Sequence, residues 1–584
     1  MDFKQINTRF LFSLFIFIFL IIGLLNFLAP TIGFSSSKQM SYNLLNKLTY
    51  NKRVPLDDIA LVVIDDKSLL EIGRWPWNRE YYLEIFDYLE NYTKTKVFGY
   101  DGLIISPDNE RLESDKKFFS EVKKFKKLTS AVSFLYNEFP NNINEKEYDE
   151  FLKTKSDIKI IDKRSKKYQK ISNFKSFTVL QKQYLKNINS LGLIINTSDN
   201  DEYTRKITQL INYKGDFIPH MSLVLYSGVT GIKEYILTDK FLYGFSNNYS
   251  LKVPVQNING MVKNYICYYN SQDDIYSHKT YSASDIIYSY RAIKQGKKPI
   301  INPSEFNNKI VIVGANAQAL ALADVKRTPV SESFSGADIV ATNLDNLLQN
   351  SFFTETNKTF DFVTCILIVL FVFWFVNILP SSIALLSSLS LGLVYFIFTY
   401  FMYSNKIAVD FILPEFYILF ALLCGYTYKY LVENSKKNKI QKAMGKYLSN
   451  EVMQNVVNNI DNIALGGKRA DITVLFADIR NFTSISENMD AASTSMILNE
   501  YFSAMVPIIE EHNGVLNKFM GDAVLAIFGE PKKSDNHALD AVKCGYRMLQ
   551  KVKYLQEKWI DEGKPKIEIG IGISSGDAFV GNIG

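Results

Sequence analysis

The distribution of apolar residues along the chain predicts its coarse architecture. Four stretches have the roughly 20-residue apolar length that a helix needs to cross a hydrocarbon core of about 30 Å. They are Phe10–Leu28, Phe362–Leu379, Ser382–Tyr403 and Ile407–Tyr428. The first three contain no charged residue, whereas the fourth has Asp410 and Glu415 near its start. Each could instead be a buried core helix, and the first could be a signal peptide, although no A-x-A cleavage site follows it. We predict four transmembrane helices.

Positive charge beside these stretches indicates their orientation, because positively charged short flanks stay in the cytoplasm. Lys4 and Arg9 precede the first stretch. Six lysines follow the fourth: Lys429, Lys436, Lys437, Lys439, Lys442 and Lys446. We therefore expect both ends of the chain in the cytoplasm and the long segment between the first two helices outside it.

The outer segment alternates strand-like and helix-like stretches, as in "DIALVVIDDKSLLEIG" and "YYLEIFDYLENY", which predicts an α/β domain. Predicted strands end at Asp65, at Asp101 and at the glycine of "KIVIVGAN". Open α/β sheets place ligands at such strand ends, but either aspartate could equally cap a helix or a turn. Trp75 and Trp77, which flank Pro76, are read as a packed corner in preference to a ligand cage.

The inner segment begins with an amphipathic pattern. Apolar residues recur at Ile440, Met444, Leu448, Val452 and Val456. This spacing predicts a helix with one buried face. The helix could pair with a second copy as a parallel linker that carries a signal inward, or pack on its own domain.

Two carboxylates then follow short apolar strands. "DITVLFADIRNFTSISE" predicts a strand to Ala477, then Asp478 and a helix start; "VLNKFMGDAVLAIFG" predicts a hairpin with Asp522 at its tip. If the two strands are neighbours, both carboxylates converge on a divalent metal site, beside helix N–H groups suited to phosphate. Taken singly, Asp478 could be a helix cap and Asp522 a turn residue.

Composition adds few constraints. A chain of 584 residues is too long for one domain. The net charge of +6 is small for this length and includes the lysine cluster, so we expect no nucleic-acid partner. The four cysteines, Cys267, Cys365, Cys424 and Cys544, are distributed so that no disulfide framework is expected.

The outer segment resembles the second type of CHASE domain, an extracytoplasmic sensor of bacterial cyclases and histidine kinases. The resemblance is carried by "IDDKSLLEIGRWPWNR", "VFGYDGLI", "YSASDII" before "FNNKIVIVGANA", and "TPV…FSGADIVATNLDNLL". It implies an extracytoplasmic ligand of unknown identity, with one membrane helix before the sensor and three after it.

The inner segment resembles the catalytic domain of class III nucleotide cyclases. Its signature strand "FADIR-x-FT" is Phe476–Thr483, and its "K-x-x-GD" hairpin is Lys518–Asp522. The resemblance implies an α+β ferredoxin-like fold and two Mg²⁺ or Mn²⁺ ions bound by Asp478, Asp522 and the backbone carbonyl of Ile479. It also implies that the N–H groups of Phe482 and Thr483 bind the nucleotide's phosphates.

The same resemblance implies a substrate and a homodimer. At the position of Lys518 it implies recognition of adenine, and hence ATP over GTP, although Lys518 could be a solvated surface lysine. Family sites form between two protomers, so Lys518 would serve its partner's aspartates. Asn481 stands where the bacterial pattern often has glycine, and little effect is expected because both residues tolerate a helix-start conformation.

The predicted protein is therefore a multi-pass receptor adenylate cyclase of the inner cell membrane, which touches lipid and forms cyclic AMP. Its predicted parts are a cytoplasmic N-terminus (1–9), a transmembrane helix (10–32), an extracytoplasmic sensor (33–355), three further transmembrane helices (360–379, 382–403 and 407–430), a juxtamembrane signalling helix (431–469) and a partial cyclase domain (470–584). The alternative is a non-catalytic receptor with a cyclase-like dimerisation domain. No Gly-Gly-Asp/Glu-Glu-Phe motif supports a diguanylate cyclase.

The final stretch, "ISSGDAFVGNIG", resembles a strand and glycine-containing turn in the latter half of the cyclase domain. Relatives continue into a second base-reading residue and a helix with an Asn and an Arg that act in the transition state. We expect that these are not present in this chain, that the domain is cut at Gly584, and that the chain alone binds nucleotide weakly with little turnover.

Overall fold

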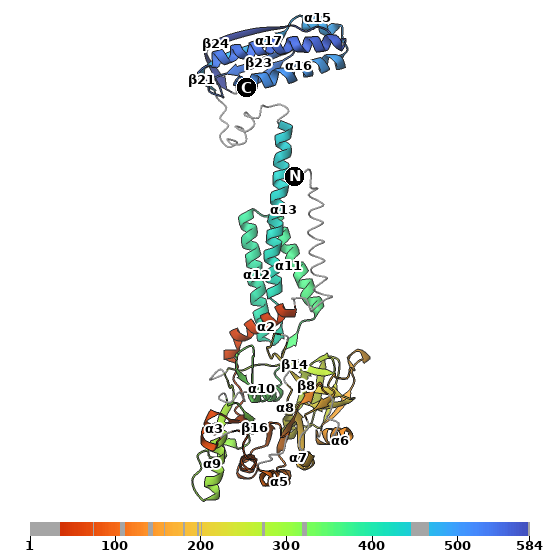
Figure 1. The fold of residues 1–584 in the computed structure, drawn as a ribbon, viewed down its shortest axis with the longest axis vertical. Helices are drawn as coiled ribbons and strands as arrows, with labels where there is room; N and C mark the ends of the chain where they lie inside the picture. The colour runs from red at the N-terminus through yellow and green to blue at the C-terminus, as the bar shows by residue number, and fades with distance from the viewer. Residues whose placement is uncertain are drawn as a thin grey trace. The chain divides into compact units, whose positions relative to one another are not determined.

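The computed structural model describes residues 35–581 apart from 74, 106–110, 138–143, 157, 179–181, 196–197, 200, 271–274, 318–323 and 445–466. The chain forms two compact units, which we call the N-terminal unit (residues 1–429) and the C-terminal unit (residues 430–584), and their elements are labelled in Figure 1.

The N-terminal unit is built on a sheet of six parallel strands. Their order is β15 (Lys279–Ser282), β1 (Ile59–Ile64), β16 (Ile310–Ala315), β2 (Val97–Asp101), β3 (Leu128–Val132) and β7 (Ser190–Leu193). All six residues of β1 are buried, as expected for a parallel strand covered on both faces. The α/β prediction for this segment is confirmed, including the three strands taken from sequence.

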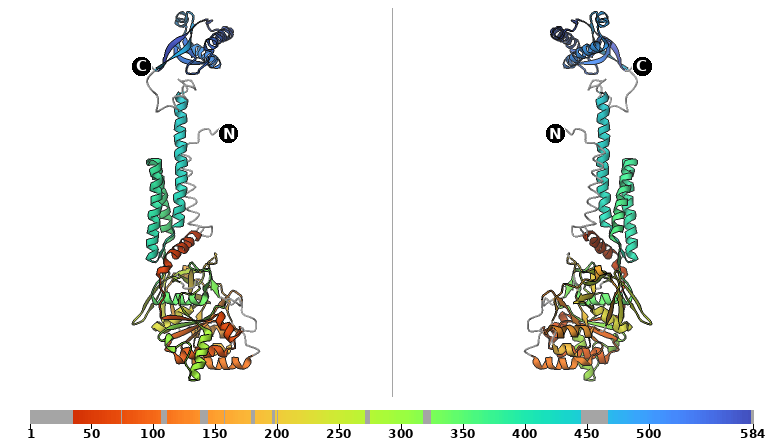
Figure 2. Two further views of the ribbon diagram at one scale, coloured as in Figure 1. Left: turned by 90° about the vertical axis from the view of Figure 1, so that its left-hand side faces the viewer. Right: turned by 90° about the vertical axis from the view of Figure 1, so that its right-hand side faces the viewer.

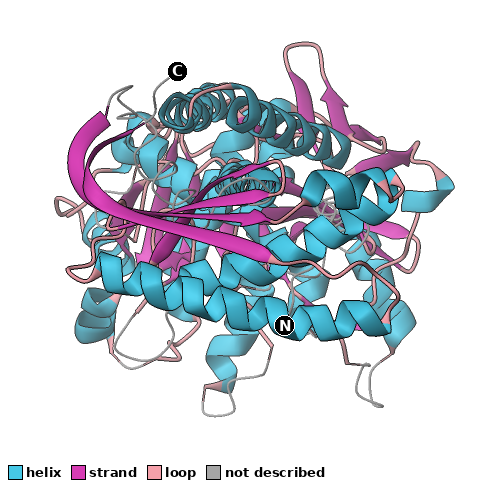
Figure 3. Cartoon of the chain, turned by 90° about the horizontal axis from the view of Figure 1, so that it is seen from above, coloured by secondary structure: helices cyan, strands magenta, loops and turns pink. Residues whose placement is uncertain are grey.

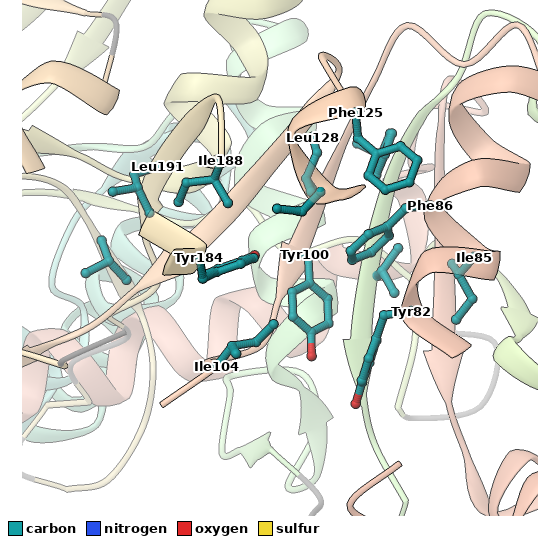
Figure 4. Close-up of a cluster of buried hydrophobic side chains, with 14 of the residues drawn as sticks. Tyr82, Ile85, Phe86, Tyr100, Ile104, Phe125, Leu128, Tyr184, Ile188 and Leu191 are labelled. Carbon is teal, nitrogen blue, oxygen red and sulfur yellow. The ribbon is translucent and has the colours of Figure 1, made fainter. Parts of the chain in front are cut away.

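Helices cover both faces of this sheet. Alternate residues of β1 pack into different cores: Ala60 and Val62 belong to one hydrophobic cluster, and Leu61 and Val63 to the other. The first cluster is rich in aromatic side chains, and Figure 4 shows Tyr82 and Phe86 beside Tyr100 of β2. On this side lie α3 (Asp66–Ile72), α4 (Glu80–Asp87), α5 (Leu112–Glu121), α6 (Glu145–Lys155), α7 (Lys182–Asn187) and α9 (Ala283–Lys294). The other side carries α8 (Met221–Thr230) and α10 (Gly336–Leu348).

Smaller sheets and short helices complete the described part of this unit. One four-stranded sheet has β12 (Ser250–Pro254), β11 (Phe241–Phe245), β10 (Glu234–Leu237) and β5 (Lys159–Asp162). A second has β13 (Gln256–Ile258), β14 (Met261–Tyr265), β8 (Lys206–Tyr213) and β9 (Asp216–Pro219). Two-residue strands pair as β4 (Phe134–Leu135) with β6 (Ser176–Phe177), β17 (Val325–Lys326) with β18 (Phe334–Ser335), and β19 (Thr354–Glu355) with β20 (Ile407–Ala408). Single turns of helix are η1 (Tyr50–Lys52), η2 (Tyr88–Tyr92), η3 (Val122–Lys124), η4 (Lys166–Tyr168) and η5 (Pro303–Phe306).

Long apolar helices follow the sheet domain. Helices α11 (Lys358–Ile378) and α12 (Ser381–Ser404) are long and apolar enough to cross a membrane, and these two are the helices of the described part that meet this test. They pack beside each other and near α2 (Ser35–Thr49) and α13 (Ile412–Met444), as Figures 1 and 2 show. A side chain at Gly392 of α12 would meet the carboxylate of Glu415 at 2.7 Å, so α12 and α13 approach closely at this glycine.

The prediction of four membrane helices is confirmed in part. The stretches 362–378 and 382–403 are helical, Leu379 follows the end of the first helix, and Phe10–Leu28 lies outside the described residues. The start of the fourth stretch was wrong, because Ile407 and Ala408 pair as a short strand with Thr354 and Glu355, and the helix begins only at Ile412. The helix then continues without a break to Met444, so the predicted linker helix begins as part of α13, and Leu448, Val452 and Val456 lie outside the described residues.

The C-terminal unit is a four-stranded antiparallel sheet with helices on one face. The strand order is β22 (Gly514–Met520), β23 (Ala523–Phe528), β21 (Gly467–Ile479) and β24 (Ile569–Gly581), and Figure 3 draws the strands in magenta. Helices α16 (Ala491–Glu511) and α17 (His537–Asp561) bury Tyr501, Met505, Met548 and Trp559 against it. The chain order strand, helix, two strands, helix, strand is that of the ferredoxin-like fold, which confirms the α+β prediction for the described residues.

Strand β24 corrects the interpretation of the last stretch. Gly576 and Asp577 do not form a turn; they pair with Ile472 and Asp471 inside a ladder that runs from Ile569 to Gly581. The apolar alternation on both sides of this Gly-Asp pair belongs to one strand, since the long partner β21 offers hydrogen bonds along its whole length.

Candidate functional site

Strand β21 presents Asp478 on the face of the sheet that the helices do not cover. Leu475, Ala477 and Ile479 alternate into the core formed with α16 and α17, and Asp478, between the last two, is exposed. Because side chains alternate along a strand, the carboxylate is placed at the strand end on the open face.

The hairpin between β22 and β23 presents Asp522. Met520 and Ala523 are paired, so the loop consists of Gly521 and Asp522 alone. Gly521 has φ of +67°, a conformation that glycine adopts without steric cost and that tight hairpins require. The predicted hairpin with a carboxylate at its tip is confirmed.

The sheet brings the two carboxylates together. Ala477, next to Asp478, is paired with Val524, two residues from Asp522. Burial raises the pKa of Asp522, the negative charge of Asp478 raises it further, and a hydrogen bond with the backbone of Ile479 works in the opposite direction. Asp478, Ile479 and Asp522 therefore meet at one point, about 43 residues apart in sequence, as strand pairing had predicted.

This donor set fits a divalent metal that is shared with a phosphorylated ligand. Within the described ranges no group of three or more His, Cys, Asp or Glu side chains is arranged to hold a metal ion. Mg²⁺ usually binds through only one or two carboxylates and takes its other ligands from phosphate and water. The pKa of Asp522 is raised by burial and by the negative charge of Asp478, and a cation bound between the two carboxylates would counteract this repulsion.

The start of α15 (Phe482–Glu487) lies directly after β21. Asn481 precedes the helix with φ of +57° and ψ of +29°, the left-handed conformation. Asparagine is among the few residues that tolerate this conformation, which explains why Asn481 can replace the glycine of the bacterial pattern. The backbone N–H groups of Phe482 and Thr483 begin the helix, where an N–H has no acceptor within the helix.

Lys518 lies on the strand that leads into the hairpin with Asp522. It lies exposed on β22, the edge strand, opposite Leu525 and just after a bulge at Asn517. Two strand spacings of about 4.8 Å separate β22 from β21. The assignment of Lys518 to adenine therefore stays a prediction.

Sequence reasoning missed Tyr501. This side chain of α16 is fully buried, and its hydroxyl has no hydrogen-bond partner among the described residues. Burial raises its pKa, and the charges of Asp478 and Asp522 raise it further, which places the hydroxyl near both carboxylates. The apolar pattern of α16 predicts a core position for Tyr501 but gives no sign of this proximity.

In the N-terminal unit, the structure decides between a ligand contact and a structural role for Asp65, Trp75 and Trp77. Asp65 caps α3, because its carboxylate accepts hydrogen bonds from the Ser68 N–H at 2.8 Å and from the Ser68 and Ser282 hydroxyls. Trp77 is buried and donates to the Gly73 carbonyl, and Trp75 packs beside it. The packed-corner interpretation is confirmed for the tryptophans.

Asp101 remains a candidate for ligand contact. It ends β2, and burial together with the negative charge of Asp324 raises its pKa to about 7. A side chain at Gly336 would meet the Asp324 carboxylate at 2.0 Å, so glycine leaves room for this second acid. Asp101 and Asp324 thus form an acidic pair at the strand ends, where α/β sheets carry ligands.

A buried charged triad was also missed. His278 lies between Asp338 and Asp345 of α10, with the Asp338 carboxylate on Nδ1 and the Asp345 carboxylate 3.2 Å from Nε2. Burial alone would lower the pKa of His278, but the two carboxylates more than offset this and raise it to about 9. No sequence pattern links His278 to residues 60 and 67 positions away.

The described site and fold define a class: an α/β domain followed by apolar helices and a ferredoxin-like domain in which two carboxylates lie together at one end of the sheet. Family models identify it further. The CHASE2 domain model matches residues 16–378, well over half of the chain, and the adenylate and guanylate cyclase catalytic domain model matches residues 467–584. The chain belongs to the CHASE2 domain family, and it carries a class III adenylate/guanylate cyclase catalytic domain.

Individual relatives match about a quarter of this chain. An adenylate cyclase of Anabaena cylindrica is 31% identical over 156 residues, which cover 25% of this chain and 30% of the relative. The uncharacterized protein Rv1319c of Mycobacterium tuberculosis is 30% identical over 149 residues, 26% of each chain. The crystal structure of the guanylyl cyclase Cya2 shares 40% identity with a TM-score of 0.20, over 20% of this chain and 60% of that one. The chain thus spans about a quarter of the curated relatives' length.

Proposed function

We propose that this protein is a membrane receptor adenylate cyclase that converts ATP to 3′,5′-cyclic AMP and pyrophosphate in response to an extracytoplasmic signal. The observation that carries the proposal is the convergence of Asp478 and Asp522 at one end of the cyclase-domain sheet. A domain kept only for dimerisation would have no use for two like charges held together, because their repulsion is unfavourable.

Each residue of the site has a role in this proposal. Asp478 and Asp522 bind the metal ions, and the Ile479 carbonyl adds a neutral oxygen ligand. Two Mg²⁺ or Mn²⁺ ions, when bound, would favour ionisation of the ribose 3′-hydroxyl and neutralise the triphosphate. The N–H groups of Phe482 and Thr483 bind the β- and γ-phosphates, held in place by the left-handed turn at Asn481.

The test of the metal assignment is Asp478→Ala in the full-length protein. We expect cyclic AMP formation from ATP and Mn²⁺ to fall at least about a thousandfold, since a lost metal ligand removes several kcal/mol of transition-state stabilisation. Asp561→Ala, at the exposed end of α17, is the matched control and should retain wild-type activity. Wild-type-like product from Asp478→Ala would contradict the assignment.

ATP is proposed as the substrate because an ammonium at Lys518 can donate a hydrogen bond to N1 of adenine. Lys518→Glu should lower the ratio of cyclic AMP to cyclic GMP formed from equimolar ATP and GTP, since a carboxylate accepts from guanine. The exposed Lys553→Glu on α17 is the charge-matched control. An unchanged ratio in Lys518→Glu would mean that Lys518 does not touch the base.

The proposed arrangement in the membrane keeps four crossings, at 10–32, 360–379, 382–403 and, with its start moved to Ile412, 412–430. Helices α11 and α12 support two of them by length and composition. The lysines after the fourth stretch favour a cytoplasmic cyclase domain (470–584) joined to the membrane by the signalling helix (431–469). The sensor (33–355) would then face the outside of the inner cell membrane, where it binds its ligand, and two chains would dimerise through the cyclase domain.

A further inference from the structure

A cavity of about 350 Å³ lies in the N-terminal unit where the sheet domain meets α12. Its walls come from four segments: the α2–η1 connection with Lys52 and Arg53, the end of α10 with Ser351 just beyond it, Tyr269, and the end of α12 with Tyr403 and Lys406. A volume of this size is within the range of small-ligand sites. Nothing in the cyclase chemistry uses it.

The charge of this cavity is positive and unbalanced. Lys52, Arg53 and Lys406 line it, and none of its lining residues is acidic. None of the three cations forms an ion pair with a described residue. The C-terminal end of α12 favours nearby cations, but a helix end carries only about half an elementary charge. Three cations exceed what that helix end can balance.

Arg53 is held in place for binding. Its guanidinium donates to the Asn46 side chain, the Tyr268 carbonyl and the Thr49 hydroxyl, and it lies 5.1 Å from the ring centre of Phe353. A guanidinium fixed by packing loses little entropy when it binds an anion. Lys406 is tied to the other side by a 2.7 Å hydrogen bond to the Ser351 hydroxyl.

An unused polar atom also faces this region. Tyr403 lines the cavity and is 1% exposed, and its hydroxyl has no hydrogen-bond partner in the described part of the chain. A buried hydroxyl without a partner is unfavourable, so a ligand oxygen that accepts from it would relieve that cost.

The nearest acid that the lining residues touch is Asp345, which already has other partners. Tyr269 and Gln349 both donate to Asp345, and Asp345 in turn faces His278. Asp345 is therefore engaged behind the cavity wall, and the lining itself carries no acidic side chain.

We propose that this cavity binds a phosphate-type anion, held by Arg53, Lys52 and Lys406 with the Tyr403 hydroxyl as a fourth donor. The same chemistry suits free inorganic phosphate and the phosphodiester of an acidic lipid headgroup, which the position beside a candidate membrane helix makes accessible. The proposal concerns the N-terminal unit and does not depend on cyclase activity.

The test measures binding to the detergent-solubilised full chain and to the chain in nanodiscs. Inorganic phosphate is titrated by calorimetry, and phosphatidylcholine nanodiscs with and without phosphatidylglycerol are compared by thermal unfolding. We expect phosphate or phosphatidylglycerol to raise the unfolding temperature. Binding of phosphate alone assigns the free anion, and a shift with phosphatidylglycerol alone assigns the lipid headgroup.

Variants make the test specific. Lys52→Gln with Lys406→Gln should weaken the binding of the active probe at least about tenfold, because charge-assisted hydrogen bonds are lost. Tyr403→Phe should weaken it while the ligand-free unfolding temperature stays equal or rises, since the unpartnered hydroxyl is removed. Arg53→Gln is used only if it folds. Exposed Lys297→Gln is the control that should bind as wild type. No shift with either probe, or an equal shift in the double variant, would overturn the proposal.

Discussion

Asn481 holds the turn between β21 and α15 in a left-handed conformation, and its substitution gives a prediction at the scale of one residue. Alanine in this conformation costs roughly 1–2 kcal/mol, whereas glycine has no such cost. Asn481→Ala should therefore weaken Mn²⁺–ATP binding about five- to thirtyfold, and Asn481→Gly should leave it within about twofold.

Calorimetric titration of the two variants side by side is the measurement. The pair is internally controlled, because both lose the asparagine side chain and only one loses the conformation. Equal weakening in both would mean that the side-chain amide, and not the turn, matters for binding.

Residues that act in short local patterns were predictable, and residues that act across the chain were not. Asp478 and Asp522 each end a recognisable strand or hairpin, so their convergence followed from pairing those strands. Tyr501 and His278 acquire their surroundings only when distant elements pack. The residues next to them in sequence give no sign of these surroundings, so neither was predicted as a site residue.

At the scale of elements, the carboxyl end of β2 carries a pH prediction. The pKa of Asp101 is raised to about 7 by burial and by Asp324, with Lys326 acting in the opposite direction. The folded state then binds a proton that the unfolded chain releases at a pH near 4, so the free energy of unfolding falls as the pH rises from about 4 to 7.

Asp101→Asn should flatten this dependence. The difference in unfolding temperature between pH 5 and pH 8 should be smaller in Asp101→Asn than in the wild type, as measured by thermal denaturation of the full chain. His278, with its pKa raised to about 9, also loses stabilisation as the pH rises above its ordinary value, so the two proteins are compared at each pH. An unchanged difference would show that Asp101 stays ionised in the folded state.

The predicted boundaries of helices and strands were wrong where pairing with a distant strand determines them. An apolar pattern alone cannot distinguish the start of a helix from two residues that pair with a distant strand, which is what Ile407 and Ala408 do. The stretch around the Gly-Asp pair of β24 was expected to contain a turn, and it is instead continuous strand because it pairs with β21 along all 13 residues. The strands of the six-stranded sheet were easier to predict from sequence, because buried strands are continuous apolar runs.

At the scale of the whole molecule, a shared active site predicts complementation between variants. If Lys518 serves the aspartates of the second protomer, coexpressed Asp478→Ala and Lys518→Glu chains form heterodimers with one intact site. With equal expression, random pairing in a two-fold symmetric dimer restores about a quarter of wild-type activity. Cyclic AMP formation by membranes that contain both full-length chains is the measurement.

The matched control is coexpression of Asp478→Ala with Asp522→Ala. Both aspartates lie together in one chain, so every site in that mixture lacks one carboxylate and no activity should return. Recovery in the control, or none in the first mixture, would contradict a site shared between protomers.

The triad of His278, Asp338 and Asp345 has a consequence for how this domain can change over generations. Removing His278 alone leaves two buried carboxylates without their counterion, at a cost of roughly 3–5 kcal/mol, whereas replacing all three residues with apolar residues of similar volume is often tolerated. A change that begins with His278 therefore passes through an unfit intermediate. Two of the members lie on α10 and His278 on a segment 60 residues before Asp338, so His278 is expected to be retained for as long as either aspartate is.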